Sequence, residues 1–229
     1  YEVIESKAAD FYGLDKTPIE VEIEYAGQIV KAAMTNKSLY TNVSIKKTGY
    51  AQTMNNNVMR WTVSGVRNDS TTSLQSFYWR DTLPTDAVRL TRLVTGTYST
   101  TQTYKVTFTT NLNSQWRTAY DNLSTAKNYT LDMSSAALGL ASNEYVTQFM
   151  LSFGIVPAGF HQLTNATVDA QTLYALTNGY KFTNKADVGG LLGGNWVQSI
   201  ARWTTSIYSH YVPAKPAAPK SPKLPRTGY

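Results

Sequence analysis

The feature of this chain that most constrains its fold is the alternation of apolar and polar residues in short runs. Side chains of a β-strand point to opposite faces of the sheet in turn, so alternation predicts strands with one face in a core. Such runs recur from LYTNVSIKK at residue 39 to NWVQSIARWTTSIYSH at residue 195, mostly separated by Gly, Pro and Asn. This pattern is typical of an all-β, Ig-like β-sandwich. The first forty residues predict three or four further short strands.

Two stretches depart from the strand pattern. In SQWRTAYDNLSTA, the residues Trp116, Tyr120 and Leu123 recur at helical spacing, which predicts one short helix. The double glycines of VGGLLGGN predict a loop at residues 188–195, and their spacing does not fit a phosphate-binding motif.

The composition gives no support for an enzyme that turns over a substrate. The chain has no cysteine, and its two histidines, His161 and His210, are not in a cluster with ligand spacing. The run LDMSS is similar to a metal-adhesion motif D-x-S-x-S, but Ala136 replaces its last serine. We therefore expect no turnover catalysis, no metal site and no cofactor.

The charge distribution argues against nucleic-acid binding, although the net charge is +6. Residues 211–229 contain four basic residues and no acid, which leaves only +2 on the rest of the chain. No basic run interleaved with aromatic residues occurs there, so we expect no nucleic-acid partner.

Three polar residues interrupt apolar rows. Alternation places Lys47 on the face of Val43 and Ile45, in the run VSIKK. By the same rule, Asp81 shares a face with Phe77 and Trp79, and Asn184 shares one with Phe182 and Ala186. Isolated burial of such groups costs several kcal/mol, so we expect the three to meet in the core.

An amine, a carboxylic acid and a carboxamide in one dry core can form a bond. Burial lowers the pKa of a lysine and raises that of an acid, so the neutral amine of Lys47 could attack the Asn184 carboxamide while Asp81 moves protons. The product is a Lys–Asn isopeptide bond, and ammonia leaves. Two alternatives remain at this point: a buried ion pair without chemistry, and Lys46 in place of Lys47 if a bulge reverses the alternation.

The first forty residues contain a similar pair. Glu5 shares a face with Tyr1 and Val3, and Asn36 shares one with Val30 and Met34. We interpret Glu5 as the equivalent acid and Asn36 as the equivalent cross-linking residue, with the partner lysine expected upstream of a chain that looks cut at both ends.

These motifs resemble a known family of surface proteins. YEVIESKAADFYGL resembles a segment of collagen-adhesin B-type domains of Gram-positive pilins and adhesins, although Ala9 and Phe11 replace the usual Pro and Gly. YWRDTLP and YKFTNKADV resemble the acid-bearing and Asn-bearing strands of isopeptide-forming pilin domains. MTNKSLYTNVSIKKTG resembles the seam between two such domains, whereas residues 90–175 are matched only by their strand-rich character.

The resemblance implies three regions and a means of attachment. We expect the C-terminal portion of a B-type domain at residues 1–40, an isopeptide-forming domain at 41–210 and a Pro/Lys-rich wall spacer at 211–229. The spacer ends in a sortase signal of the form L-P-x-T-G, formed by Leu224, Pro225, Arg226, Thr227 and Gly228. A sortase would cleave after Thr227 and pass the acyl group to a peptidoglycan cross-bridge or a pilin lysine.

The expected function is therefore that of a secreted, wall-anchored structural protein, a basal pilin or an adhesin stalk. No convincing acceptor-lysine motif is present, which favours a base or anchor over the shaft. The alternative is an adhesin module that binds a host matrix protein such as collagen, or a glycan.

Overall fold

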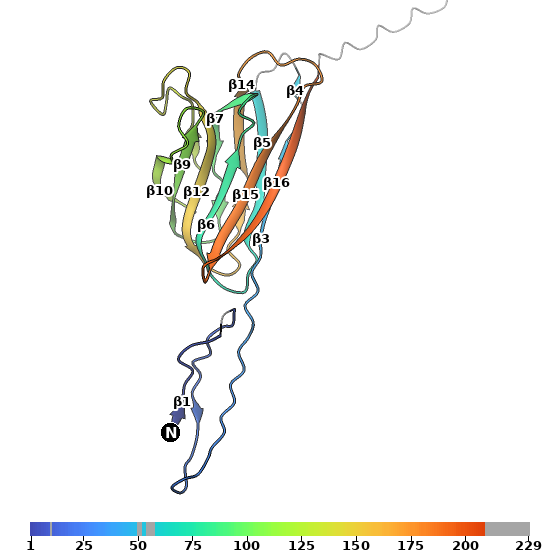
Figure 1. Cartoon of the computed structure of the whole chain (residues 1–229). Coiled ribbons are helices and arrows are strands. Elements are labelled where there is room, and N and C mark those ends of the chain that lie inside the picture. The colour runs from blue at the N-terminus through green and yellow to red at the C-terminus, as the bar shows by residue number, and fades with distance from the viewer. Residues whose placement is uncertain (10, 50–51, 54–57, 209–229) are drawn as a thin grey trace, which may run out of the picture.

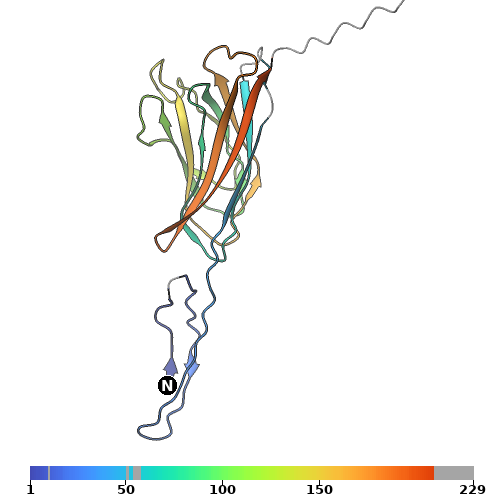
Figure 2. The ribbon, with the colours of Figure 1, turned by 45° about the vertical axis from the view of Figure 1, so that its right-hand side comes forward.

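The computed structural model describes residues 1–9, 11–49, 52–53 and 58–208 of the 229-residue chain. Two facing β-sheets form a sandwich from β3 onward, and residues 1–40 lie outside it as an extended segment (Figures 1 and 2). The predicted all-β sandwich is confirmed. Among the described residues no helix occurs that is long and apolar enough to cross a membrane.

The larger sheet has seven strands, and all its neighbours are antiparallel except β16 and β4. In spatial order its strands are β10 (Arg117–Ser124), β9 (Thr103–Thr110), β12 (Val146–Val156), β6 (Leu74–Thr82), β15 (Lys181–Leu192), β16 (Asn195–Tyr208) and β4 (Gln52–Thr53).

The smaller sheet has five antiparallel strands. In spatial order they are β11 (Thr130–Asp132), β7 (Val88–Val94), β14 (Ala166–Thr172), β5 (Val58–Asn68) and β3 (Val43–Gly49). Two further pairs are β13 (Gln162–Thr164) with β8 (Thr97–Tyr98), and β1 (Glu2–Val3) with β2 (Ile19–Glu20).

Large aromatic side chains fill the space between the two sheets. Trp61, Phe77, Trp79, Phe149 and Phe160 are all at most 1% exposed. The indole of Trp79 donates a hydrogen bond of 2.8 Å to the Tyr98 hydroxyl, so the polar atom of this buried ring is satisfied. The alternation rule therefore placed Phe77 and Trp79 on the correct face.

The predicted short helix is wrong, since the residues from Arg117 onward form β10 instead. The register of β10 against β9 shifts between Thr118 and Tyr120 and again between Tyr120 and Leu123. Each bulge adds one residue to β10, so Tyr120 and Leu123 both pack on the core although they are three positions apart. The bulge between Tyr120 and Leu123 therefore gives two residues of a strand the spacing expected of a helix.

The predicted loop at residues 188–195 is also mostly wrong. β15 continues through Gly189 and Gly190, and only Gly193 and Gly194 form the turn into β16. A Cβ on Gly189 would lie 2.9 Å from the Tyr78 ring, and one on Gly190 would lie 2.9 Å from the Leu74 side chain. The first glycine pair therefore permits close packing within a strand, not a change of direction.

The N-terminal segment has less regular structure than its sequence pattern predicts. Between residues 1 and 40, leaving out residue 10, it has only the two-residue strands β1 and β2 and the isolated bridge between Tyr12 and Ser38. Tyr1, Tyr25 and Ile29 are 65–86% exposed. With no second layer to cover them, these apolar residues contribute little to stability.

Candidate functional site: a buried lysine, aspartate and asparagine

The candidate site lies between the sheets, where β3 faces β6 and β15. Lys47 comes from β3, the edge strand of the smaller sheet, whereas Asp81 and Asn184 come from neighbouring strands inside the larger sheet. Asp81 pairs with Ala186, so Asn184 lies diagonally across from it on the same inward face. All three side chains are buried, and Asp81 and Asn184 are 0% exposed.

The structure places Lys47 inside and leaves Lys46 exposed. A bulge does occur between β3 and β5, at the step from Ser44 to Lys46. The extra residue belongs to β5, where Gly65 has a φ of 62°, so the alternation of β3 continues unbroken. Lys47 therefore keeps the inward position that the sequence pattern predicted for it.

The amine of Lys47 makes a direct ion-pair contact with Oδ2 of Asp81. Its Nζ also lies 5.8 Å from the centre of the Trp61 ring, which itself packs edge-on against Phe182. Both side chains of the ion pair are thus fully buried, with an aromatic ring beside the amine. Trp61 is a part of the site that sequence reasoning missed, although its inward position follows from the alternation within VMRWTVSG.

Burial dominates the protonation of the pair. It lowers the pKa of Lys47, and the charge of Asp81 offsets this only in part. It likewise raises the pKa of Asp81, opposed by the nearby Lys47 amine and the Asn184 carboxamide. Both shifts favour the neutral pair, an amine beside a carboxylic acid, over the ionised pair.

The third member, Asn184, makes no hydrogen bond of good geometry to another described residue. Neither its amide nitrogen nor its amide oxygen has a partner of good geometry among the described residues, and Oδ1 of Asp81 has none either. The carboxamide still lies close enough to Asp81 to affect its pKa. Unsatisfied buried polar atoms of this kind cost about 1–3 kcal/mol each, so such a cluster calls for an explanation beyond packing.

The N-terminal segment brings the second predicted pair together in a different setting. The Asn36 amide donates a hydrogen bond of 2.6 Å to Oε1 of Glu5, and the Asp15 backbone amide donates one of 3.1 Å to Oε2. Both side chains are only partly buried, and among the described residues no lysine forms an ion pair with Glu5. Glu5 and Asn36 therefore meet, but without the third group.

Other sequence predictions fall elsewhere. The sortase signal at 224–228 and His210 lie outside the described residues. His161 is on the surface near β13, where its ring contacts the Gly159 carbonyl. Within the part of the chain that the structure describes, no group of three or more His, Asp or Glu side chains could hold a metal ion.

Comparisons with known proteins bear only on the fold. No family model matches the sequence, and no curated protein is significantly similar to it. Among solved structures, the chain is similar to the major pilin subunit BcpA of Bacillus cereus, at 9% identity and a TM-score of 0.40, over 91% of this chain and 54% of that one. The chain thus spans about half the length of that pilin.

Two further similar structures are collagen-binding domains. One belongs to a Staphylococcus aureus adhesin, at 13% identity and a TM-score of 0.33, over 71% of this chain and 96% of that one. The other is ACE19 of the Enterococcus faecalis surface protein ACE, at 13% identity and a TM-score of 0.34, over 72% of this chain and 95% of that one. Because these TM-scores are low, the proposals below depend on the chain's own residues.

Proposed function

We propose that this chain is a structural module of a bacterial cell-surface protein, a basal pilin or adhesin stalk, stabilised by an isopeptide bond between Lys47 and Asn184. The observation that carries the proposal is the buried contact between the Lys47 amine and Asp81, beside an Asn184 carboxamide with no hydrogen bond of good geometry to another described residue. A polar cluster of this composition is costly as packing, but it holds every group that the reaction requires.

The reaction begins with a proton transfer within the pair. The Lys47 ammonium gives a proton to Asp81, which both pKa shifts favour. The neutral amine then attacks Cγ of Asn184, while the Asp81 acid stabilises the oxygen on which negative charge develops. A proton moves from the lysine nitrogen to the amide nitrogen, the C–N bond breaks and ammonia leaves. Fixed proximity between the groups supplies much of the rate.

The bond would join the two sheets toward the end of the sandwich at which β16 finishes, because Asn184 pairs with Trp203 there and lies far from the β15–β16 turn. The N-terminal segment meets the sandwich at one end, and β16 finishes at the opposite end (Figure 1). A covalent link from β3 to β15 would carry a pulling force past most of the intervening strands. For a cysteine-free protein, this link would replace the stabilising effect of a disulfide, roughly 4–5 kcal/mol for so long a loop.

Attachment and domain division complete the proposal. We assign residues 1–40 to the end of a preceding B-type domain, 41–210 to the cross-linked domain and 211–229 to a wall spacer.

The sequence LPRTG then serves as a sortase signal, and the flanking prolines favour the extended backbone that a protease-like active site needs. Incubation with a housekeeping-type sortase and a glycine nucleophile should remove Gly228 and Tyr229, whereas an intact C-terminus under conditions that cleave a control peptide would contradict this assignment.

The decisive experiment for the cross-link is the intact mass of the folded protein. We expect it to be lower than the sequence mass by one ammonia, and tandem mass spectrometry should find a peptide that joins β3 to β15. Lys47→Ala and Asp81→Ala should each restore the full mass. Lys46→Ala is the matched control, since Lys46 is the exposed neighbour, and it should leave the deficit in place.

An unmodified mass in a well-folded wild-type sample would show that Lys47 and Asp81 form only a buried ion pair, without a covalent bond to Asn184. A deficit that disappears in Lys46→Ala and persists in Lys47→Ala would show that the wrong lysine has been assigned.

A further inference from the structure

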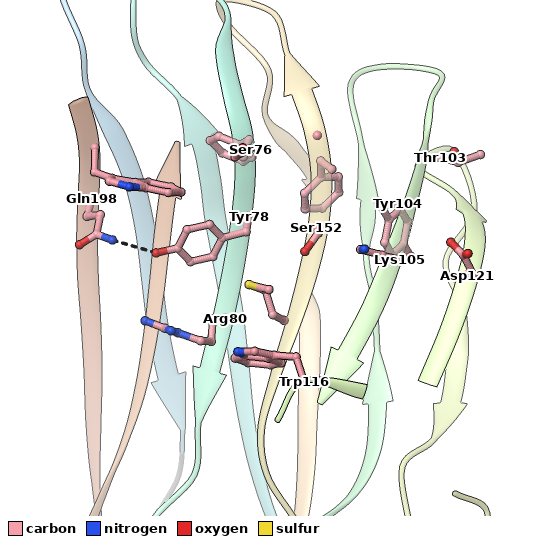
Figure 3. A pocket seen from close by; sticks show the side chains of 15 residues that line it. Ser76, Tyr78, Arg80, Thr103, Tyr104, Lys105, Trp116, Asp121, Ser152 and Gln198 are labelled. Carbon is pink, nitrogen blue, oxygen red and sulfur yellow. Dashed lines mark hydrogen bonds between the residues drawn. The ribbon is translucent and has the colours of Figure 1, made fainter. Parts of the chain in front are cut away.

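A groove of about 670 Å³ crosses the outer face of the seven-stranded sheet, on the opposite side from Lys47 and Asp81. Its floor is formed by β6 and β12, and its two ends by the β16 side and the β10 side of the sheet (Figure 3). Its volume lies in the range of small-molecule sites. Nothing in the proposed cross-link uses this face.

Irregular backbone marks the floor of the groove. Ser76 of β6 has a φ of 49°, Asn122 of β10 has a φ of 55°, and the register of β12 against β6 shifts on both sides of Gly154. Bulges bend strands and re-aim their side chains, and positive φ at a residue other than glycine is strained. Three strands of one sheet thus depart from regular geometry at or beside this groove.

Aromatic side chains line the groove. Tyr78 lies flat over the sheet because Gly189 beneath it has no side chain, and the Gln198 amide donates a hydrogen bond of 3.0 Å to its hydroxyl (Figure 3). Trp196 packs against the Tyr78 ring at a steep angle and is 55% exposed. Trp116, whose ring lies beside Arg80 in Figure 3, is 40% exposed. Each tryptophan therefore has free apolar surface at this groove.

Polar side chains with free hydrogen-bonding capacity line the same groove. Lys105 and Ser152 make no side-chain hydrogen bond to another described residue, and Asp121 accepts only the backbone amide of Asn122. Arg80, by contrast, is already held by Asp187 in a two-fold contact of 3.0–3.1 Å. The groove therefore has free donors and free acceptors together.

We propose that this groove binds an oligosaccharide. A pyranose ring has a face of C–H bonds that packs on an indole, whose π face carries partial negative charge, and a rim of hydroxyls that both donate and accept. The exposed faces of Trp116 and Trp196 match the first property, and Lys105, Asp121 and Ser152 match the second.

An added peptide strand fits this surface less well. It would need an open strand edge, whereas the backbone of β6 and β12 is already paired on both sides. A proline-rich segment offers mostly acceptors, so the Asp121 carboxylate would gain no partner from it.

The test uses the full chain, labelled and applied to an array of neutral and acidic oligosaccharides that also carries spots of collagen and gelatin. We expect binding to one group of glycans, and we then titrate the best one by calorimetry. Trp116→Ala and Trp196→Ala should each weaken binding about tenfold, the loss of one good aromatic contact. Tyr25→Ala is the matched control, an exposed aromatic residue outside the groove, and it should change nothing.

Three results would overturn the proposal: no glycan binding, binding to collagen alone, or glycan binding that survives both tryptophan substitutions together. Transfer of saturation from indole protons to the bound sugar, measured by NMR on the wild type, gives a readout that does not depend on any variant folding. The proposal is independent of the cross-link, because Lys47→Met should retain glycan binding while it restores the full mass.

Discussion

Two regions of this molecule each bring an acid and an asparagine together, but with different surroundings. In the sandwich, Asp81 and Asn184 are fully buried and a lysine completes the set. In the N-terminal segment, Glu5 and Asn36 form a hydrogen bond of 2.6 Å in a part of the chain with almost no core. The comparison teaches that the same two residue types can lie in very different surroundings, which residue identity alone does not determine.

The physical difference between the two pairs is desolvation. Asp81 has its pKa raised first of all by burial, and the amine beside it is shifted in the opposite direction for the same reason. Glu5 is only partly buried, and it accepts hydrogen bonds from the Asn36 amide and from the Asp15 backbone amide. Four predictions test this contrast, in order of decreasing expected effect.

The largest effect should come from Asp81→Ala. It would prevent the cross-link, worth roughly 4–5 kcal/mol, and leave the Lys47 amine buried without its partner, which costs about 3–5 kcal/mol more. For a domain of this size we expect the melting temperature to fall by more than roughly 15 °C. Calorimetry on wild type and variant measures this, with Asp69→Ala, on a half-exposed ion pair, as the control. Equal melting temperatures for wild type and Asp81→Ala would contradict the expected stabilising role of the buried Asp81.

The next effect should come from Lys47→Met, compared with Lys46→Met. The first removes the amine and the cross-link but fills the same space, so we expect a loss of roughly 4–5 kcal/mol. The second changes an exposed side chain and should stay within about 0.5 kcal/mol. Denaturant unfolding of both variants checks this. If the two losses were alike, burial of Lys47 would have no special role.

A smaller effect concerns pH. In Lys47→Met the Asp81 carboxyl remains buried, with its pKa raised by burial and without the opposing amine. A raised pKa means that the folded state holds its proton where the unfolded state has lost it. Stability should therefore fall as the pH rises above about 4, by up to ~1.4 kcal/mol per pH unit, until the folded pKa is passed.

The control for the pH dependence is the double variant Lys47→Met with Asp81→Asn. It has no titrating group at this place, so the decline between pH 4 and neutral pH should disappear. Chemical unfolding across this pH range measures both variants. A decline that persists in the double variant would have to arise from another group.

The smallest effect should come from Glu5→Gln. The Glu5–Asn36 pair is only partly buried and makes no described contact with the sandwich core. We therefore expect the free energy of unfolding of the sandwich to change by less than about 0.5 kcal/mol. A peptide of residues 1–40 should likewise show no cooperative unfolding, because it leaves its strand edges open. A sharp melt of that peptide would show that the segment is stable by itself.

The sequence by itself determined which side chains face inward. A strand has a side-chain period of two, so Lys47, Asp81 and Asn184 could be assigned to the buried face from their apolar neighbours alone. That rule failed where the backbone adds a residue. The bulges of β10 placed Tyr120 and Leu123 on one face at a helical spacing, and no local residue pattern marks those bulges.

The tertiary structure decided which of these residues meet and what lies on the other face of the sheet. The pairing of β6 with β15 and the packing of β3 across them bring together Lys47, Asp81 and Asn184, which are separated by 34 to 137 positions in the sequence. Such long-range pairing depends on the topology of the sheets, and local periodicity does not reveal it. The groove depends on it too, since its lining residues come from strands that are far apart in the sequence, from Ser76 of β6 to Gln198 of β16. Alternation assigns a side chain to a face, whereas only the order of the strands decides its neighbours.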